Sequence, residues 1–305
     1  MKRICWTTMA VSLLVLPACK GGANVDAVKL VPDEAEFVVG VNPKAVTGSE
    51  VYKAFSGDLE KEADYKEMVE ALKGCNLEVS SFDRFVVGAT AKEDFVAVVE
   101  AAGIGKDENA TCIINKIAEE SGEEANNSVS NKDGKKIVQF ADGRAYLVND
   151  NMLAIATTSW EDKVGALIDG EGKPAVDNSK KDLYGAIDNK AAVWFVAAVP
   201  TEVSAMGAMF GAPELADVKT AAGSLDLSSG VGVNLIVDMA DEAKAKAAAD
   251  KANGMLEEVK KAPQAKDFDS TMKSLEIKAD GGKITIKAAA SMDDINKAKE
   301  LAPGM

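Results

Sequence analysis

The chain has 305 residues, of which 47% are apolar, and its 35 basic and 49 acidic side chains give a formal net charge of -14. The apolar share is ordinary for a globular chain, whereas the acidic balance argues against nucleic acid or anionic lipid headgroups as direct ligands, because both need basic patches. The sequence contains no histidine, which excludes Ser-His-Asp and Cys-His catalysis and removes the commonest metal ligand. We therefore expect no metal, no cofactor and no enzymatic activity.

Residues 1–18 have the form of a secretory signal peptide. Lys2 and Arg3 precede an apolar run over residues 9–16, which is far shorter than the roughly 20 residues that a transmembrane helix needs. The run ends in Leu16-Pro17-Ala18-Cys19, which resembles the bacterial lipobox. The resemblance implies that the chain is cut before Cys19 and that this cysteine carries acyl chains such as palmitate. The alternative is an ordinary signal peptide that is cut near Ala18.

The expected location is the bacterial cell envelope. Lys20 follows the cysteine, where an Asp would signal retention in the inner membrane of enteric bacteria, so we expect the outer membrane, on its periplasmic or surface face. Acyl chains on Cys19 would hold the protein there, since each buried CH₂ adds about 0.8 kcal/mol. Residues 19–26 then form a tether that includes Gly21 and Gly22. Loss of the signal peptide leaves 33 basic and 49 acidic residues, a formal charge of -16.

Apolar runs and turn signals predict the elements of the first half. A strand covers residues 35–43, a helix covers 58–74, two hairpin strands cover 82–90 and 94–101, and a second helix covers 107–121. A further strand at 151–157 follows the turn Asn149-Asp150-Asn151. Strands that are joined by tight turns predict an antiparallel sheet.

Two cysteines remain in the body of the chain, Cys75 before the hairpin and Cys112 in the helix after it. The two strands of a hairpin begin and end at one end of a sheet, so these residues can meet. Cysteines in an oxidising compartment usually pair, and we expect a disulfide. The alternative is two free buried thiols.

The second half repeats the markers of the first in the same order. "AEFVVGVNP" (35–43) resembles "AVWFVAAVP" (192–200), and "NMLAIATTSWED" (151–162) matches "KITIKAAASMDD" (283–294). The second pair predicts capping boxes, with Ser159 and Asp162 in one copy and Ser291 and Asp294 in the other. Strands near 221–229 and 230–239 and a helix at 241–261 complete the second copy. In that helix Ala248, Ala252, Met255, Leu256 and Val259 form the predicted buried stripe.

These markers predict a duplicated α+β unit, an antiparallel sheet with helices packed on one face. The expected boundaries are a first copy at 27–170, a linker at 171–182 and a second copy at 183–302. The opening strand "VPDEAEFVVGV" (31–41), the cysteine at 75 and the strand "FDRFVV" (82–87) resemble a family of secreted and lipid-anchored bacterial proteins that is frequent in myxobacteria and their relatives. The family has no known function, so the resemblance implies only the fold and the location.

Two functional hypotheses follow. The first is a lipid-anchored envelope protein with a non-enzymatic structural or interaction role, whose partner is an unidentified envelope protein. The alternative is a carrier or chaperone for an apolar ligand or partner, with Met206, Met209 and Phe210 as a possible contact patch, because Met-rich surfaces adapt to varied ligands. The alternative interpretation of that segment is a buried helix. An exposed, continuous apolar cleft would favour the carrier, and a closed core with a charged surface would favour the first hypothesis.

Overall fold

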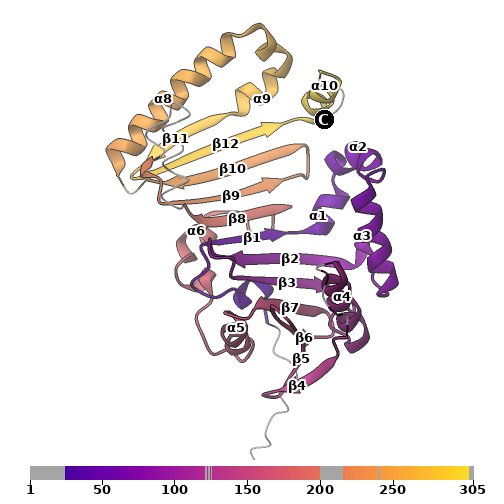
Figure 1. Cartoon of the computed structure of the whole chain (residues 1–305). Coiled ribbons are helices and arrows are strands. Elements are labelled where there is room, and N and C mark those ends of the chain that lie inside the picture. The colour runs from indigo at the N-terminus through magenta and orange to yellow at the C-terminus, as the bar shows by residue number, and fades with distance from the viewer. Residues whose placement is uncertain are drawn as a thin grey trace, which may run out of the picture.

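The structure is a computed structural model that describes residues 25–301, except residues 121, 123, 125, 200–215 and 240. In that part of the chain the strands form one sheet of 12 strands, and each neighbouring pair is antiparallel. Helices pack on this sheet (Figure 1). The antiparallel α+β class predicted from the sequence is therefore confirmed.

The elements have the following bounds. The strands are β1 (Phe37–Val41), β2 (Phe82–Ala89), β3 (Phe95–Ala101), β4 (Val129–Lys132), β5 (Lys135–Phe140), β6 (Gly143–Asn149), β7 (Met152–Thr157), β8 (Val193–Ala198), β9 (Thr220–Asp226), β10 (Val231–Asp238), β11 (Glu276–Asp280) and β12 (Lys283–Ala290). The helices are α1 (Pro43–Gly48), α2 (Glu50–Leu59), α3 (Ala63–Gly74), α4 (Asp107–Glu120), α5 (Glu161–Ile168), α6 (Lys181–Ala186), α8 (Glu242–Lys261), α9 (Asp269–Ser274) and α10 (Met292–Leu301). Single 3-10 turns are η1 (Ala27–Leu30), η2 (Val79–Ser81), η3 (Ala175–Asp177) and η5 (Pro263–Phe268).

The two halves of the chain meet at the centre of the sheet. The strand order is β11-β12-β10-β9-β8-β1-β2-β3-β7-β6-β5-β4. Counted outward from the central pair, the first half gives β1-β2-β3-β7-β6 and the second gives β8-β9-β10-β12-β11, so both follow one pattern. This shared order agrees with the repeated markers in the sequence, whereas the boundaries of the two copies stay predictions.

The central pair depends on a contact between a glycine and a tryptophan. Gly40 of β1 lies opposite Trp194 of β8, and a Cβ atom on Gly40 would lie 2.1 Å from the indole ring. The ring therefore rests directly on the backbone of β1. Its other contacts include Tyr184, whose ring centroid is 5.1 Å away in an edge-on arrangement, and Trp194 is only 3% exposed. The indole has little room to move.

The two faces of the sheet are covered differently. Residues that pair directly across an antiparallel ladder share a face, so the registers sort the side chains of the sheet. One face carries the main core, where η1, α5, η3 and α6 pack over Val38, Val86 and Val196. On the other face α3 and α4 cover the strands of the first half, and α8 covers β10 to β12. The long helices therefore lie on one face, as predicted, and shorter segments cover the centre of the opposite face.

Two predictions of local structure are wrong. The helix expected at 58–74 is divided, because α2 ends at Leu59, the chain turns, and α3 begins only at Ala63. A hydrogen bond between the side chains of Tyr52 and Tyr65 joins α2 to α3 and raises the pKa of Tyr52 to about 12. The β4–β5 hairpin was not predicted. Its turn residues Asp133 and Gly134 both have positive φ (52° and 76°), as a tight hairpin turn requires.

The predicted stripe of α8 is buried only in part. Ala245 and Ala249 are buried and Ala248, Ala252 and Leu256 are half-buried, whereas Met255 and Val259 are more than half exposed. The reason is position, since α8 lies along the edge strand β11 (Figure 1). Its last turns have only one neighbouring strand to cover them.

One of the two predicted capping boxes is present in part, because Ser291 accepts a hydrogen bond at the start of α10 but the Asp294 carboxylate accepts from Ser270 and Thr271. The backbone N–H of Asp294 donates to Ser291 Oγ at 3.2 Å at the start of α10. The prediction for α5 is wrong, because Trp160 is the N-cap residue and the Ser159 hydroxyl donates to the carboxylate of Asp94. A tertiary hydrogen bond thus replaces the local one at that position.

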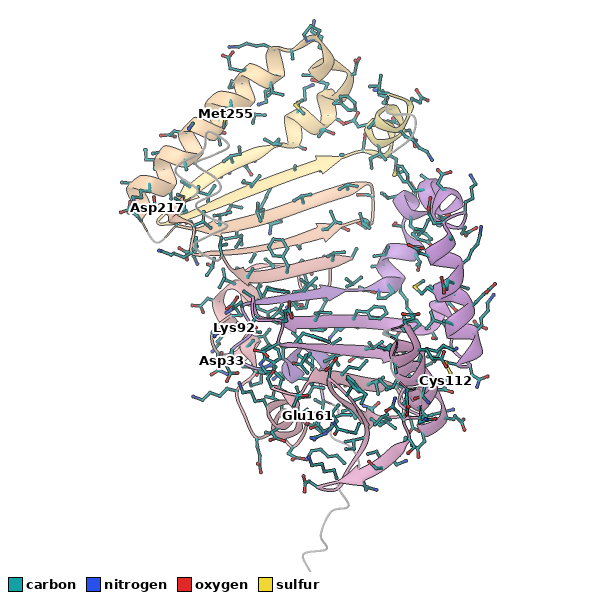
Figure 2. The ribbon with its side chains drawn as sticks, in the orientation of Figure 1. Asp33, Lys92, Cys112, Glu161, Asp217 and Met255 are labelled. Atoms are coloured by element: carbon teal, nitrogen blue, oxygen red, sulfur yellow. A yellow bond between two sulfur atoms is a disulfide. The ribbon has the colours of Figure 1, made fainter. Side chains whose placement is uncertain are left out.

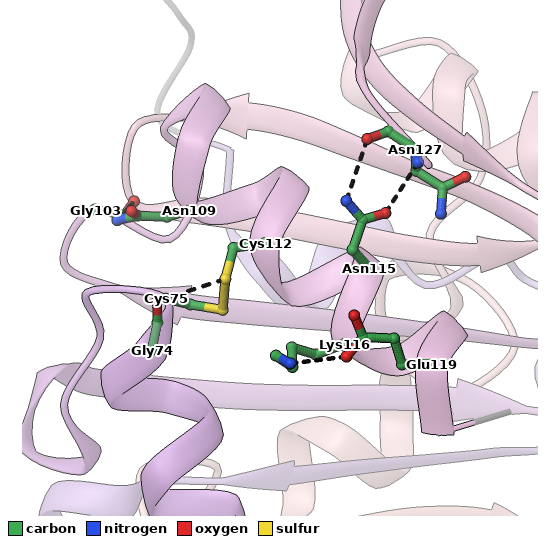
Figure 3. Close-up of a disulfide and its surroundings, with 9 residues drawn as sticks. All are labelled: Gly74, Cys75, Gly103, Asn109, Cys112, Asn115, Lys116, Glu119 and Asn127. Carbon is green, nitrogen blue, oxygen red and sulfur yellow. Dashed lines mark hydrogen bonds and ion pairs between the residues drawn. A yellow bond between two sulfur atoms is a disulfide. The ribbon is translucent and has the colours of Figure 1, made fainter. Parts of the chain in front are cut away.

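Cys75 and Cys112 form the predicted disulfide, with Cα atoms 5.5 Å apart. Figure 3 shows that the bond joins the end of α3 to α4. The bond spans 37 positions in the sequence and contributes roughly 3–4 kcal/mol by limiting the unfolded chain.

A buried ion pair fixes α5 to the sheet. The guanidinium of Arg144 on β6 lies 2.5 Å from the carboxylate of Glu161, and the two side chains are 6% and 10% exposed. Arg144 also donates to the Tyr146 hydroxyl at 2.8 Å, and that hydroxyl donates to the carbonyl oxygen of Glu161 at 2.8 Å. Burial raises the pKa of Tyr146, which keeps its hydroxyl protonated as a donor. Glu161, which is labelled in the lower part of the view in Figure 2, is 7% exposed as a whole residue.

We predict that Gly40→Ala lowers the free energy of unfolding by about 1–3 kcal/mol, because the added methyl group overpacks the site against a fixed indole. Urea unfolding followed by circular dichroism measures the change. The matched control is Gly57→Ala in α2, where a Cβ atom meets nothing within 4 Å; it should be neutral or stabilise by up to about 1 kcal/mol. Equal stability of Gly40→Ala and the unchanged chain would contradict the packing argument.

We predict that Glu161→Ala lowers the free energy of unfolding by about 3 kcal/mol, since it leaves Arg144 buried without its counter-ion. The neighbouring Asp162 provides the control: its side chain is 98% exposed and 3.9 Å from Arg144, so Asp162→Ala should change stability by less than about 0.5 kcal/mol. The same urea experiment applies. Similar losses for both variants would show that the buried pair is not the stabilising feature.

Candidate functional site

The candidate site is an apolar surface in the middle of the sheet, on the face that carries α3, α4 and α8. We call it the open sheet face. It is built by six strands, β3, β2, β1, β8, β9 and β10, whose side chains form three cross-strand rows. The rows are Val99, Phe85, Val41, Val193, Leu225 and Val233; Ala97, Val87, Val39, Phe195, Gly223 and Leu235; and Phe95, Ala89, Phe37, Ala197, Ala221 and Val237.

Exposure alternates along these strands: one face is mostly buried, whereas on the other face the described helices leave several large side chains partly exposed. Phe37, Val87, Phe95 and Val233 are 36–39% exposed. Val38, which follows Phe37 on β1 and points to the opposite face, is 0% exposed. Large apolar side chains that gather on one exposed surface are uncommon in soluble proteins and mark interaction sites.

The chemistry of the open sheet face is uniform. None of the side chains in the three rows carries a charge or a hydrogen-bonding group. The ring of Phe195 lies over Gly223, whose added Cβ atom would be 2.8 Å from it, so the ring lies flat along the sheet. Six strands about 4.8 Å apart and five residues per strand give a surface of roughly 24 by 14 Å.

Helices frame the open sheet face. α3 and α4 stand at one end and α8 at the other, and Figure 1 shows the central strands crossing between these two groups. Along the remaining side α10 reaches α2, where Lys299 Nζ donates to the carbonyl oxygen of Ala54 at 2.8 Å and lies 4.7 Å from the ring centroid of Phe55. Lys299 is also 3.3 Å from Asp58, and hydrogen bonds from Lys61 and Lys299 lower the pKa of that carboxyl.

One polar cluster has the composition of a catalytic dyad but not its geometry. Ser179 Oγ donates to the backbone carbonyl of Asp33 at 3.0 Å, and Lys180 Nζ donates to Ser179 Oγ at 3.3 Å. Burial lowers the pKa of Lys180. The hydroxyl proton is directed at a carbonyl oxygen instead of the amine, so this arrangement does not activate the serine as a nucleophile.

Of the other site residues predicted from the sequence, the structure describes the two disulfide cysteines but not the lipidation cysteine or the apolar patch. Cys75 and Cys112 are joined, whereas Cys19 and the patch of Met206, Met209 and Phe210 lie outside the described residues. Among the described residues, no His, Cys, Asp or Glu side chains form a group of three that could hold a metal ion. In the same part of the chain no helix combines the length and apolar composition that crossing a bilayer requires.

Sequence reasoning missed the open sheet face as a site. Its signal was present in the strands at 35–43 and 192–200, where nearly every residue is apolar. Such runs are typical of strands buried on both faces, and the sequence alone did not indicate that one face stays uncovered.

The comparisons with known proteins support the fold. No family model and no curated protein matches the chain. The structure of crystal form III of TP0453 is similar with a TM-score of 0.52 and 8% sequence identity, over 91% of this chain and 99% of that chain. The structure of crystal form IV of TP0453 gives a TM-score of 0.52 and 9% identity, over 90% of this chain and 96% of that chain. The chain therefore shares its overall fold with TP0453 over nearly the whole length of both proteins.

Proposed function

We propose that the protein is a lipid-anchored, non-enzymatic carrier of the bacterial cell envelope and that it binds the acyl chain of an apolar ligand on the open sheet face. One observation carries the proposal: three rows of apolar side chains without a polar group run across six strands, and the described helices, which pack on the two ends of these rows, leave four large side chains more than a third exposed. A continuous exposed apolar surface favours a carrier over a purely structural role. The rows do not include Met206, Met209 and Phe210, the patch that the sequence suggested, which lies outside the described residues.

A hydrocarbon chain suits this surface better than a polar ligand. Because the rows contain no hydrogen-bonding side chain, the open sheet face can gain binding free energy from the burial of apolar ligand area, but it cannot orient polar groups of a ligand. Covering roughly 300 Å² of apolar surface contributes about 8 kcal/mol before the costs of binding. The hydrocarbon core of a bilayer is roughly 30 Å thick and two chains deep, so one acyl chain of about half that length fits within the surface.

Two features support the absence of catalysis. The chain has no histidine, and the Ser179–Lys180 pair lacks an activated hydroxyl. The charged groups of the frame, such as Lys299 and Asp58, are paired with each other and stand outside the apolar rows. A chemical step would have to occur on a surface that offers no acid, base or nucleophile.

The proposed anchor is tested at Cys19. Cys19→Ser should move the protein from the membrane fraction to the soluble fraction and abolish labelling by a fatty-acid analogue, because the acylated sulfur is lost. Cys5→Ser is the matched control, since Cys5 lies within the signal peptide, and it should leave labelling unchanged. Continued labelling of the Cys19→Ser chain would refute the anchor.

The proposed ligand is tested with cis-parinaric acid, a fatty acid whose fluorescence rises in an apolar environment. The Cys19→Ser chain should bind it, and Val39→Thr/Val87→Thr/Val233→Thr should raise the Kd about tenfold or more, because three hydroxyl groups then lack partners under the bound chain. Threonine is a good strand former, so the sheet should persist.

The control for this experiment is Val259→Thr, a more exposed valine on α8, which should leave the Kd unchanged. Failure of the acid to bind, or an equal effect of the control, would count against the open sheet face. Turnover of any substrate in a broad hydrolase screen of the same chain would contradict the non-enzymatic role.

A further inference from the structure

A second surface lies apart from the open sheet face, between the outward sides of α3 and α4. We call it the α3–α4 groove, a depression of about 440 Å³. Met68 and Leu72 of α3 and Ile113 and Ile117 of α4 form its floor. Each pair is spaced i, i+4, so the two side chains of a pair stand one above the other on their helix.

The floor is shared in part with the core, because Leu72 and Ile113 also pack against the sheet, whereas Met68 and Ile117 form its more exposed part. α4 already buries Ala110, Ile114 and Ala118 against the sheet. Met68 is 45% exposed and Ile117 is 43% exposed, although both are large and apolar. Methionine in such a position adapts its shape to varied partners, so the floor has the character of a contact surface.

The rim of the groove is acidic. Among the described residues that line the groove or its continuation toward the end of α3, Lys116 is the one cation, and its amine is 2.7 Å from the Glu119 carboxylate. The other charged side chains there are carboxylates: Asp64, Glu67, Glu70 and Glu120. The rim therefore repels anions and attracts a cationic partner.

The disulfide holds the two walls in place. Cys75 ends α3 and is bonded to Cys112, about one turn before Lys116 and two turns before Glu119 on α4 (Figure 3). A groove with fixed walls loses little conformational entropy when it is filled, which favours binding.

We propose that the α3–α4 groove binds a basic amphipathic helix of another protein. Two adjacent helices leave a furrow that a third helix fills at the usual packing distance of about 8–10 Å. The apolar stripe of that third helix would cover the floor, and its Lys or Arg residues would face the carboxylates of the rim, as in helix-in-groove recognition.

Other occupants fit this groove less well. An anionic lipid headgroup would meet the carboxylates of the rim. A second copy of this chain carries a formal charge of -16 after Cys19, so its approach is opposed by repulsion between like charges. A basic helix is the partner for which both the floor and the rim are favourable.

The probe is a fluorescent peptide about 18 residues long, since shorter isolated helices are marginal. It contains only Leu and Lys, with Leu at i, i+3, i+4 and i+7. Its binding to the Cys19→Ser chain is followed by anisotropy at low and high ionic strength.

We expect Met68→Ser/Ile117→Ser to raise the Kd about tenfold. Glu67→Gln/Glu70→Gln/Glu120→Gln should raise it several-fold and remove most of the salt dependence. Cys75→Ala/Cys112→Ala should also weaken binding.

The controls separate groove binding from general attraction to an acidic protein. Met255→Ser/Glu257→Gln/Glu258→Gln on α8 removes one exposed methionine and two carboxylates elsewhere, and it should leave the Kd within about twofold, as should the three Val→Thr changes on the open sheet face. A peptide of the same composition with evenly spread Leu should bind more weakly. Circular dichroism verifies that each variant is folded.

Equal effects of the groove and α8 variants would overturn the proposal, and so would equal binding of the two peptides. A photo-crosslinking version of the peptide gives an independent readout. Crosslinks should map to α3 and α4 by mass spectrometry, and crosslinks to the open sheet face would overturn the proposal. Loss of peptide binding when the chain dimerises would also overturn it, because a second copy of the chain would then occupy the groove.

Discussion

The contact between Gly40 and Trp194 is the constraint on which the rest of the structure depends. It lets β1 and β8 pair at the centre of the sheet, with the indole lying on a backbone that carries no side chain. Because of this pairing the two halves form one sheet of 12 strands instead of two smaller sheets with exposed edges. The apolar rows of the two halves also continue into one another only because the register of this pair aligns Val39 with Phe195.

The stability of this sheet comes mainly from one face, which leaves the other free for contact. The main core runs from Ile137 and Tyr146 in the first half to Ala222 and Ile236 in the second, beneath η1, α5 and α6. The buried pair of Arg144 and Glu161 fixes α5 over this face. On the opposite face the described helices pack at the two ends of the rows, so side chains of the central strands such as Phe37 and Val87 stay partly exposed.

The sequence was sufficient for most of the elements and for the disulfide, but not for the β4–β5 hairpin or the site. Alternation and turn residues predicted most strands, and the spacing of Cys75 and Cys112 predicted their bond. The exposed face of β1 was not predictable, because Val38 and Val39 are the same residue type and only the placement of helices makes one buried and the other accessible. Likewise Ser159 and Ser291 open the same local pattern, yet Asp94, distant in sequence, binds Ser159 and removes it from the helix cap.

The position of the first described residues bears on how a carrier would work. Val25 and η1 pack against the main core, on the face opposite the open sheet face. If Cys19 carries the proposed acyl chains, the tether would therefore meet the described part of the molecule at Val25, on its covered face. The open sheet face is then not the surface at which the tether holds the protein to its membrane. Under the proposed function the acyl chain would bind on the face opposite the one from which the tether leaves, which favours carriage of a ligand over simple insertion of the apolar face into the anchoring membrane.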